Sequence, residues 1–166
     1  GEVLSQTPAA GQKLEKGSVV EVDVSRGEAT PDISAEDKEK AAINELLQQL
    51  ARGRNDNDFA LFMSCYSYGF RSTVQNNPTY RNLDYTAWQN VQAKWFSPPY
   101  TQRMTVDNLN IIMAGDMDSA DVTFGSSYQL YEGGALSHSD YGVYTLKLVK
   151  EEVGWKILEE SWVKTQ

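Results

Sequence analysis

Apolar side chains recur at helical spacing soon after residue 34. Between Ile43 and Leu50, four apolar residues occupy positions i, i+3, i+4 and i+7, which places them on one side of an α-helix. Ser34 is positioned to cap the start of this helix, and Gly53 is positioned to end it. We therefore expect an amphipathic helix whose apolar stripe packs against a core.

Two shorter helices are predicted farther along the chain. One begins after the polar run 55–58 and has an aromatic face that extends to Tyr66. The other is capped by Asp84 and ends at the proline pair 98–99, because proline cannot continue a helix. The intervening residues 67–83 contain strong turn signals and are predicted to form a loop.

After residue 99 the spacing of apolar positions changes from helical to alternating. This alternation predicts four strands, at about 102–114, 119–132, 138–151 and 154–164. The links between them are short and rich in turn residues, so consecutive strands are expected to pair antiparallel. Helices followed by a run of long strands predict an α+β fold, with three helices packed on one face of a curved antiparallel sheet.

The first thirty residues follow a different pattern. Residues 19–25 alternate valine with polar side chains between turn signals, which predicts a strand, and residues 2–6 form a shorter candidate. Two strands cannot close a core by themselves. The expected organisation is a β segment over residues 1–28, a linker over 29–33 and one domain over 34–166.

Composition narrows the possible partners. The chain has 166 residues, a formal net charge of −8 and a pI near 4.6, which disfavours nucleic acid and anionic membranes as partners. With Cys65 as the only cysteine and His138 as the only histidine, neither an intrachain disulfide nor an ordinary transition-metal site is expected. No metal or cofactor is therefore predicted. The chain has no signal peptide and opens abruptly, which suggests a fragment of a longer protein.

Three short motifs follow one another in residues 1–27. They are Ser5-Gln6-x-Pro8, Lys16-Gly17-Ser18 and Val24-Ser25-x-Gly27. The segment resembles the second half of a PASTA domain, the module found outside the membrane on bacterial Ser/Thr kinases and penicillin-binding proteins. The first strand and helix of that module have no counterpart here. The resemblance implies an extracytoplasmic setting and contact with peptidoglycan fragments.

A second group of motifs lies in residues 34–166. It comprises Asn57-Asp58, Met63, Tyr66-Ser67, Phe70, Trp88, Gly115-Asp116, Ala120-x-Val122, Tyr128, Thr145-Leu146-x-Leu148, Gly154-Trp155-Lys156-Ile157 and Glu160. This part of the chain resembles the nuclear transport factor 2-like superfamily, which includes SnoaL-like and ketosteroid-isomerase-like domains. The resemblance implies a cystatin-like cone fold, in which three helices and a curved sheet close a cone-shaped cavity. It is similar above all to accessory copies at the C-terminus of bacterial envelope proteins.

Aromatic residues are the main candidates for the lining of such a cavity, because their rings suit an apolar ligand that carries a few polar groups. The alternative is that several of them only fill the core. The candidate ligand-binding residues are Tyr66, Tyr68, Phe70, Trp88, Tyr128, Tyr144, Glu160 and Trp162.

No catalytic residue is assigned from the sequence. Enzymes of this fold require a buried carboxylate or a His–Asp pair near the cavity floor. His138 is interpreted as a solvated turn residue. Glu160, whose neighbours in the alternation are Leu158 and Trp162, is interpreted as a structural glutamate in a salt bridge. Cys65 is expected to be a buried structural thiol, and Asp116, Asp118 and Asp121 are expected to form a turn rather than a calcium site.

These observations favour a non-catalytic, extracytoplasmic binding or sensory module. The parent would be a bacterial cell-envelope protein, such as a PASTA-containing Ser/Thr kinase or a peptidoglycan-related protein. The expected ligands are cell-wall fragments, an apolar small molecule or a protein partner. Two alternatives remain open: an isomerase or dehydratase that acts in the cavity, and a structural domain that forms a homodimer through its sheet.

Overall fold

The computed structural model describes residues 2–25, 33–75 and 77–165, and the chain divides into two compact units, Gly1–Ser34 and Ala35–Gln166. Of the predicted linker 29–33, all residues except Ile33 lie outside the described residues. Each unit is described by itself below.

The first unit contains two strands, β1 (Val3–Thr7) and β2 (Glu21–Val24), which pair antiparallel. Both predicted strands are thus confirmed, with ends shifted by one or two residues. The Ser5 hydroxyl donates to Asp23 Oδ2 across the pair at 2.6 Å. All residues of both strands are exposed, and Val24 is 57% exposed. This pair of strands therefore buries no core among its described residues.

The second unit begins with α1 (Ala35–Asn55), whose start after Ser34 agrees with the prediction. The predicted stop at Gly53 is wrong, because Gly53 is part of the helix. A Cβ atom at Gly53 would lie 2.7 Å from the backbone nitrogen of Phe62, so the glycine allows the next helix to approach α1 closely. That helix is α2 (Phe59–Ser64), which Asp58 caps by accepting a hydrogen bond from the Leu61 N–H.

The predicted loop 67–83 is wrong. It contains β3 (Tyr66–Thr73), the 3₁₀ helix η1 (Pro78–Tyr80) and β4 (Arg81–Asp84). Tyr66 therefore opens a strand and does not continue the helical face. The strand β3 pairs in parallel with the last strand of the chain, a contact across some ninety residues of sequence that local patterns cannot reveal.

The third predicted helix is confirmed as α3 (Tyr85–Ala93), with the Asp84 side chain accepting from the Ala87 N–H. It is followed by the 3₁₀ helix η2 (Lys94–Phe96), before the proline pair.

The remaining strands form the meander that the sequence predicts. They are β5 (Tyr100–Met104), β6 (Asp107–Met113), β7 (Ser119–Glu132), β8 (Ala135–Glu151) and β9 (Gly154–Lys164). The predicted strand 102–114 is two strands, β5 and β6, which pair with successive parts of β7. Strand order is β4-β3-β9-β8-β7-β5, and all pairings are antiparallel except that of β3 with β9.

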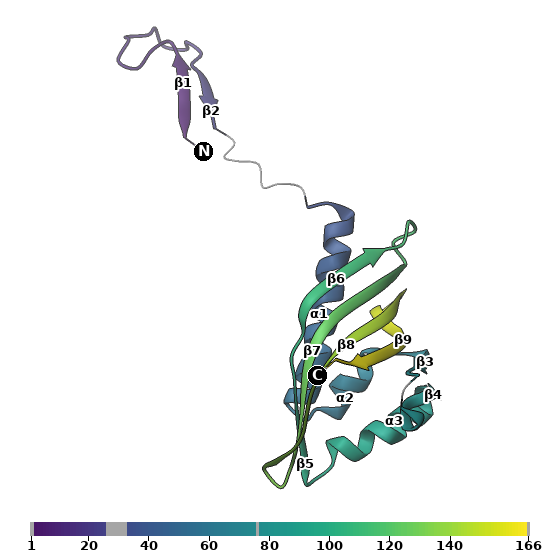
Figure 1. The fold of residues 1–166 in the computed structure, drawn as a ribbon. Coiled ribbons are helices and arrows are strands. Elements are labelled where there is room, and N and C mark those ends of the chain that lie inside the picture. The colour runs from purple at the N-terminus through teal and green to yellow at the C-terminus, as the bar shows by residue number, and fades with distance from the viewer. Residues whose placement is uncertain (1, 26–32, 76, 166) are drawn as a thin grey trace. The chain divides into compact units, whose positions relative to one another are not determined.

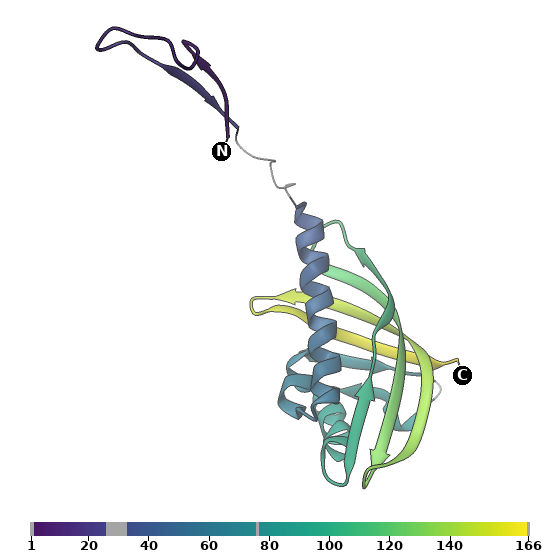
Figure 2. The same ribbon diagram turned by 90° about the vertical axis from the view of Figure 1, so that its left-hand side faces the viewer.

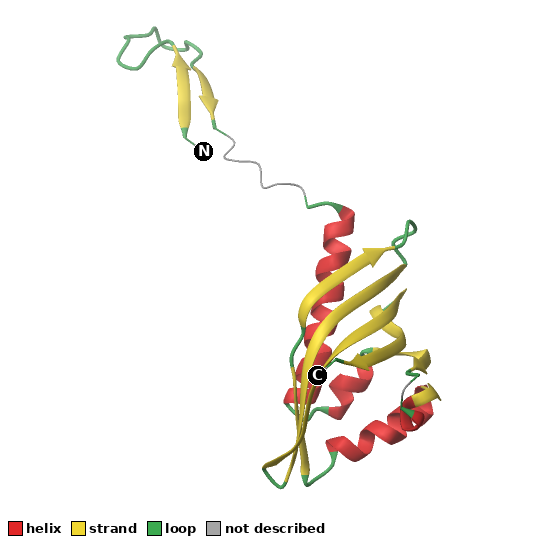
Figure 3. Cartoon of the chain, in the orientation of Figure 1, coloured by secondary structure: helices red, strands yellow, loops and turns green. Residues whose placement is uncertain are grey.

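The sheet is strongly curved, and the helices pack against one of its faces (Figures 1 and 2). Figure 3 shows the helices in red beside the long strands β7 and β8. The core between the two layers is apolar and includes Ile43 and Leu47 from α1, Phe124 from β7 and Leu146 from β8, all at most 1% exposed. Within the described residues, no helix combines the length and apolar character needed to cross a membrane.

A β-bulge interrupts β9 and determines which of its side chains face the helices. Ile157 lies opposite Leu148, and Glu159 lies opposite Lys147, so Leu158 is an extra residue on β9. Because side chains alternate between the faces of a strand, one extra residue reverses the alternation beyond it. The residue that shares the inner face with Ile157 is therefore Glu160.

Candidate functional site

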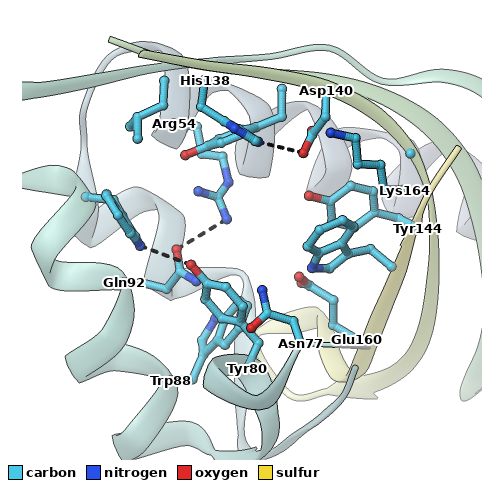
Figure 4. A pocket seen from close by; sticks show the side chains of 15 residues that line it. Arg54, Asn77, Tyr80, Trp88, Gln92, His138, Asp140, Tyr144, Glu160 and Lys164 are labelled. Atoms are coloured by element: carbon cyan, nitrogen blue, oxygen red, sulfur yellow. Dashed lines mark hydrogen bonds and ion pairs between the residues drawn. The ribbon is translucent and has the colours of Figure 1, made fainter. Parts of the chain in front are cut away.

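A cavity of about 440 Å³ lies between the helices and the inner face of the sheet (Figure 4). Its size falls within the range of roughly 300–1,000 Å³ that is usual for small-molecule sites. Its lining comes from α1, α3, the 3₁₀ helices, and strands β7, β8 and β9. The lining residues are Arg54, Asn77, Tyr80, Trp88, Gln92, Trp95, Tyr128, Leu130, His138, Asp140, Gly142, Tyr144, Glu160, Trp162 and Lys164.

Five of the eight residues predicted from the sequence line this cavity: Trp88, Tyr128, Tyr144, Glu160 and Trp162. Trp88 comes from α3, and the other four come from alternate positions on β7, β8 and β9. Alternation along each strand therefore brings these side chains to one face. The structure thus places five of the candidate residues around one cavity, and their role in ligand binding stays a prediction.

The other three predicted residues do not line the cavity. Phe70 is fully buried in the core, and Tyr66 lies beside it with ring centroids 4.9 Å apart. Tyr68 is 86% exposed and packs its ring against Tyr85. The prediction for Tyr68 is wrong. The register of β3 with β9 shifts between Tyr66 and Arg71, which interrupts the alternation, so Tyr68 does not share the buried environment of Tyr66 and Phe70.

Glu160 is the buried carboxylate of the cavity. Glu160 is 2% exposed, and the Tyr66 hydroxyl donates a hydrogen bond to Glu160 Oε2 at 2.8 Å. Burial raises the pKa of Glu160 above its ordinary value, and the hydrogen bond from Tyr66 and the charge of Arg54 offset only part of this effect. The predicted salt bridge is wrong, since no ion pair among the described residues includes Glu160. Its inward-facing neighbours are Ile157 and Trp162, and the predicted neighbour Leu158 is displaced by the bulge.

Tyr144 stands next to Glu160 on the neighbouring strand in Figure 4. Its ring stacks on Phe124, with centroids 5.1 Å apart and an interplanar angle of 6°. Burial raises the pKa of the Tyr144 hydroxyl, and it also raises that of Tyr66. Both hydroxyls therefore remain protonated at neutral pH and can donate hydrogen bonds.

Arg54 brings a positive charge into the cavity. The residue is 6% exposed, and its guanidinium donates to Gln102 Oε1 at 2.5 Å and to Gln92 Oε1 at 3.3 Å. The guanidinium carbon also lies 4.4 Å from the centroid of the Phe62 ring. Arg54 was not predicted as a site residue. It lies one helical turn after Leu50, on the same side of α1 as the apolar stripe, so the helical period could have indicated that it faces inward.

His138 and Asp140 form a second polar group in the lining. His138 Nε2 lies 2.8 Å from Asp140 Oδ2, and the His138 side chain is 48% exposed. The interpretation of His138 as a turn residue is wrong, because it lies within β8, opposite Leu130. It remains partly solvated, as expected.

Other polar lining residues were also missed. They are Asn77, Tyr80, Gln92, Trp95, Asp140 and Lys164. Asp140 lies four residues before Tyr144 on β8, and Lys164 lies two residues after Trp162 on β9. Each pair shares one face of its strand, so the two-residue period of a strand could have identified Asp140 and Lys164. The remaining residues come from helices and connecting segments, whose approach to the sheet is a tertiary feature.

Two further sequence interpretations agree with the structure. Cys65 is fully buried, and burial raises the pKa of its thiol to about 12, as suits a structural cysteine. Asp116 Oδ1 accepts the N–H of Asp118 in the turn between β6 and β7. The turn prediction is wrong for Asp121, which lies in β7 opposite Lys147. Among the residues that the structure describes, no group of acidic, histidine or cysteine side chains is arranged to hold a metal ion.

Several solved structures share this fold. A candidate scytalone dehydratase from Novosphingobium aromaticivorans matches with a TM-score of 0.66 and 13% identity, over 78% of this chain and 85% of that chain. An NTF2-like protein with a cystatin-like fold from the same organism matches with a TM-score of 0.60 and 11% identity, over 78% of this chain and 83% of that chain. Bd1075 from Bdellovibrio bacteriovorus matches with a TM-score of 0.62 and 20% identity, over 88% of this chain.

The chain spans 46% of the length of Bd1075. No protein-family model matches the sequence, and a search of curated proteins finds no match. At these identities the structural likeness shows the fold, an NTF2-like α+β cone, and leaves the activity to be argued from the site. The PASTA resemblance of residues 1–27 rests on its sequence motifs alone.

Proposed function

We propose that the cone domain binds a small organic molecule with a planar ring in the cavity beneath the curved sheet. The observation that carries this proposal is an aromatic-walled cavity of about 440 Å³ that also contains buried polar groups. The walls are supplied by Trp88, Tyr128, Tyr144 and Trp162, and the buried polar groups include Arg54 and Glu160. Such a combination is typical of small-molecule sites.

The hydrogen-bonding state of the walls also supports a binding role. The indole N–H of Trp88 is buried and has no partner among the described residues. A buried donor without a partner costs roughly 1–3 kcal/mol, and proteins rarely retain one without a reason. A ligand acceptor or an ordered water that reaches this N–H would remove this cost.

The proposal is tested by calorimetric titration with naphthylmethanol, a neutral probe with a planar ring. We expect saturable binding that weakens in Trp162→Ala, which removes a wall. Tyr68→Ala is the matched control, because Tyr68 is exposed and lies outside the cavity, and it should bind as the unmodified chain does. Absence of saturable binding for neutral, anionic and cationic naphthalene derivatives up to millimolar concentration would refute the proposal.

A second candidate function is proton transfer to or from a bound carbonyl compound. It is favoured by Glu160, whose carboxyl is buried, accepts from Tyr66 and has a raised pKa. A carboxylate in such a site can remove a proton from carbon near neutral pH. The Tyr144 hydroxyl, on the same wall, is a candidate donor to the enolate oxygen that forms.

This candidate is tested with tetralone in deuterated water. Exchange of its α-hydrogens, followed by NMR, should be faster with the unmodified chain than with Glu160→Gln, by the roughly 10²–10⁴-fold typical of a general base. Equal exchange by the two proteins would exclude Glu160 as a base and leave the binding role standing.

The resemblance of residues 1–27 to a PASTA domain supports an envelope setting for the parent protein, with peptidoglycan fragments as a further ligand. A titration of the whole chain with muropeptides tests this setting. No saturable signal up to millimolar ligand would count against it.

A homodimer through the sheet is a further alternative. It is favoured by Val143 and Val163, which lie opposite each other on β8 and β9 and are 40% and 53% exposed. Sedimentation across a concentration series tests it. A constant monomer mass would exclude the dimer.

A further inference from the structure

The cavity holds a buried cation that forms no ion pair within the described part of the chain. Arg54 is 6% exposed, and no ion pair among the described residues involves it. An arginine side chain stays protonated at any physiological pH, so the charge cannot be removed by losing a proton. Buried charges in proteins are normally paired, because an unpaired one loses hydration without compensation.

The polar groups that accept hydrogen bonds from Arg54 are two neutral amide oxygens. Gln102 Oε1 accepts from Arg54 and also from the Tyr128 hydroxyl at 3.0 Å. Gln92 Oε1 accepts from the second terminal nitrogen, while the Arg54 Nε–H is buried and unpaired. The two amides orient the guanidinium without neutralising it. Figure 4 shows this guanidinium directed into the space between the walls.

The other charged groups of the lining do not compensate Arg54. Asp140 forms no ion pair with Arg54, and its Oδ2 lies 2.8 Å from Nε2 of the half-exposed His138. Lys164, which is exposed, adds a second positive charge to the lining. Glu160 faces the same cavity, but it accepts from Tyr66 and its burial favours the protonated form. Arg54 is therefore a buried donor with no carboxylate paired to it among the described residues, in a cavity with aromatic walls.

We propose that the ligand of this cavity is a ring-bearing carboxylate, with its carboxylate against the Arg54 guanidinium and its ring among Trp88, Tyr144 and Trp162. This inference rests on the proposed binding function and adds the charge class of the ligand. A planar carboxylate matches the guanidinium in shape and can accept two parallel hydrogen bonds from it. The ring then fills the aromatic part of the cavity.

The test compares naphthoate with naphthylmethanol, which share the ring and differ in charge. Calorimetric titration at neutral pH should show naphthoate binding about 10- to 100-fold more tightly, as expected for a charge-assisted hydrogen bond. Arg54→Met, which keeps the length and apolar contacts of the side chain, should abolish this preference. Lys147→Met is the matched control and should keep it, because the Lys147 side chain is 59% exposed and lies outside the cavity lining.

Added salt separates the two cations. A preference that arises from buried Arg54 should persist in about 0.5 M salt, whereas one that arises from a solvated lysine should largely disappear. Circular dichroism and thermal melts establish that each variant is folded. If Arg54→Met does not fold, the role of Arg54 is tested by the salt series with the unmodified chain and by Arg54→Lys. Arg54→Lys should retain part of the preference for naphthoate.

The outcomes distinguish this inference from the proposed function. Equal affinities for the two probes would overturn the carboxylate assignment while supporting the ring-binding cavity. If neither probe binds, the carboxylate assignment is overturned, and if the cationic derivative also fails to bind, the proposed function is overturned with it. A naphthoate preference that survives in folded Arg54→Met, or that vanishes in salt, would also overturn the role of Arg54.

Discussion

Replacing Tyr66 with phenylalanine removes a single oxygen atom from a ring that is 4% exposed. The ring keeps its contacts with Phe62, Phe70 and Trp88, whose centroids lie 4.9–5.8 Å away. The one interaction lost is the hydrogen bond of 2.8 Å from the Tyr66 hydroxyl to Glu160 Oε2. The substitution therefore isolates the contribution of this bond to the stability of the domain.

The size of the effect should depend on the charge of Glu160. When Glu160 is protonated, a neutral hydrogen bond is lost, which costs about 0.5–1.5 kcal/mol, and when it is ionised the loss is about 1.5–3 kcal/mol. The destabilisation by Tyr66→Phe should thus increase with pH by about 1 kcal/mol. The same change should raise the pKa of Glu160 further, because the Tyr66 hydrogen bond lowers it.

Urea unfolding of the unmodified chain and the variant, at a series of pH values, measures this difference as a shift in midpoint at constant slope. For a domain of roughly 130 residues, 1 kcal/mol corresponds to about 4 °C in Tm. Tyr66→Phe in a Glu160→Gln background is the control and should show no pH dependence. A destabilisation below about 0.3 kcal/mol at all pH values, or one that shrinks as pH rises, would refute the reasoning.

Three further predictions concern other buried positions. Because the pKa of Glu160 is raised in the folded protein, the free energy of unfolding should fall as pH rises from the pKa of about 4.3 in the unfolded chain to the raised pKa of the folded protein. In urea titrations, Glu160→Gln should remove this fall and be more stable than the unmodified chain at pH values above the folded pKa. A variant with the same pH profile as the unmodified chain would contradict the raised pKa. Gly53→Ala should destabilise by about 1–3 kcal/mol in the same assay, since its Cβ would lie 2.7 Å from the backbone of Phe62, and a stabilised variant would show that the two helices can separate. Cys65, buried and with a pKa raised to about 12, should react with a chromogenic thiol reagent only after unfolding, and rapid labelling of the native protein would show that the thiol is accessible.

The sequence is sufficient to predict those elements whose pattern is local. The stripe from Ile43 to Leu50 and the cap at Asp84 predict α1 and α3, and the alternation in residues 119–132 predicts β7. Alternation along β7, β8 and β9 places Tyr128, Tyr144 and Trp162 on the inner face. Local periodicity reports which side of an element is apolar, so it succeeds where elements are long and regular.

Features that depend on distant contacts could not be predicted in this way. The strand β3 pairs with β9 in parallel, and its eight residues carry too short a pattern to be distinguished from a loop. The bulge at Leu158 cannot be found from the two-residue alternation of a strand, which assumes that no residue is extra. For this reason Leu158 was assigned to the same face as Glu160. The carboxyl of Glu160 was expected to need a charged partner, yet a tyrosine hydroxyl from β3 takes that place.

The bulge in β9 also marks a position where the chain can change in length without changing the cavity. Beyond Leu158, the inner face carries Glu160, Trp162 and Lys164, and the outer face carries Glu159, Ser161 and Val163. Loss of one codon at Leu158 would remove the extra residue, so Glu159 could still pair with Lys147 and Glu160 with Leu146. Loss of a codon farther along β9 would instead exchange the faces of the residues that follow it. Leu158 is therefore a position at which this strand can tolerate a single in-frame deletion while the chemistry of the site stays the same.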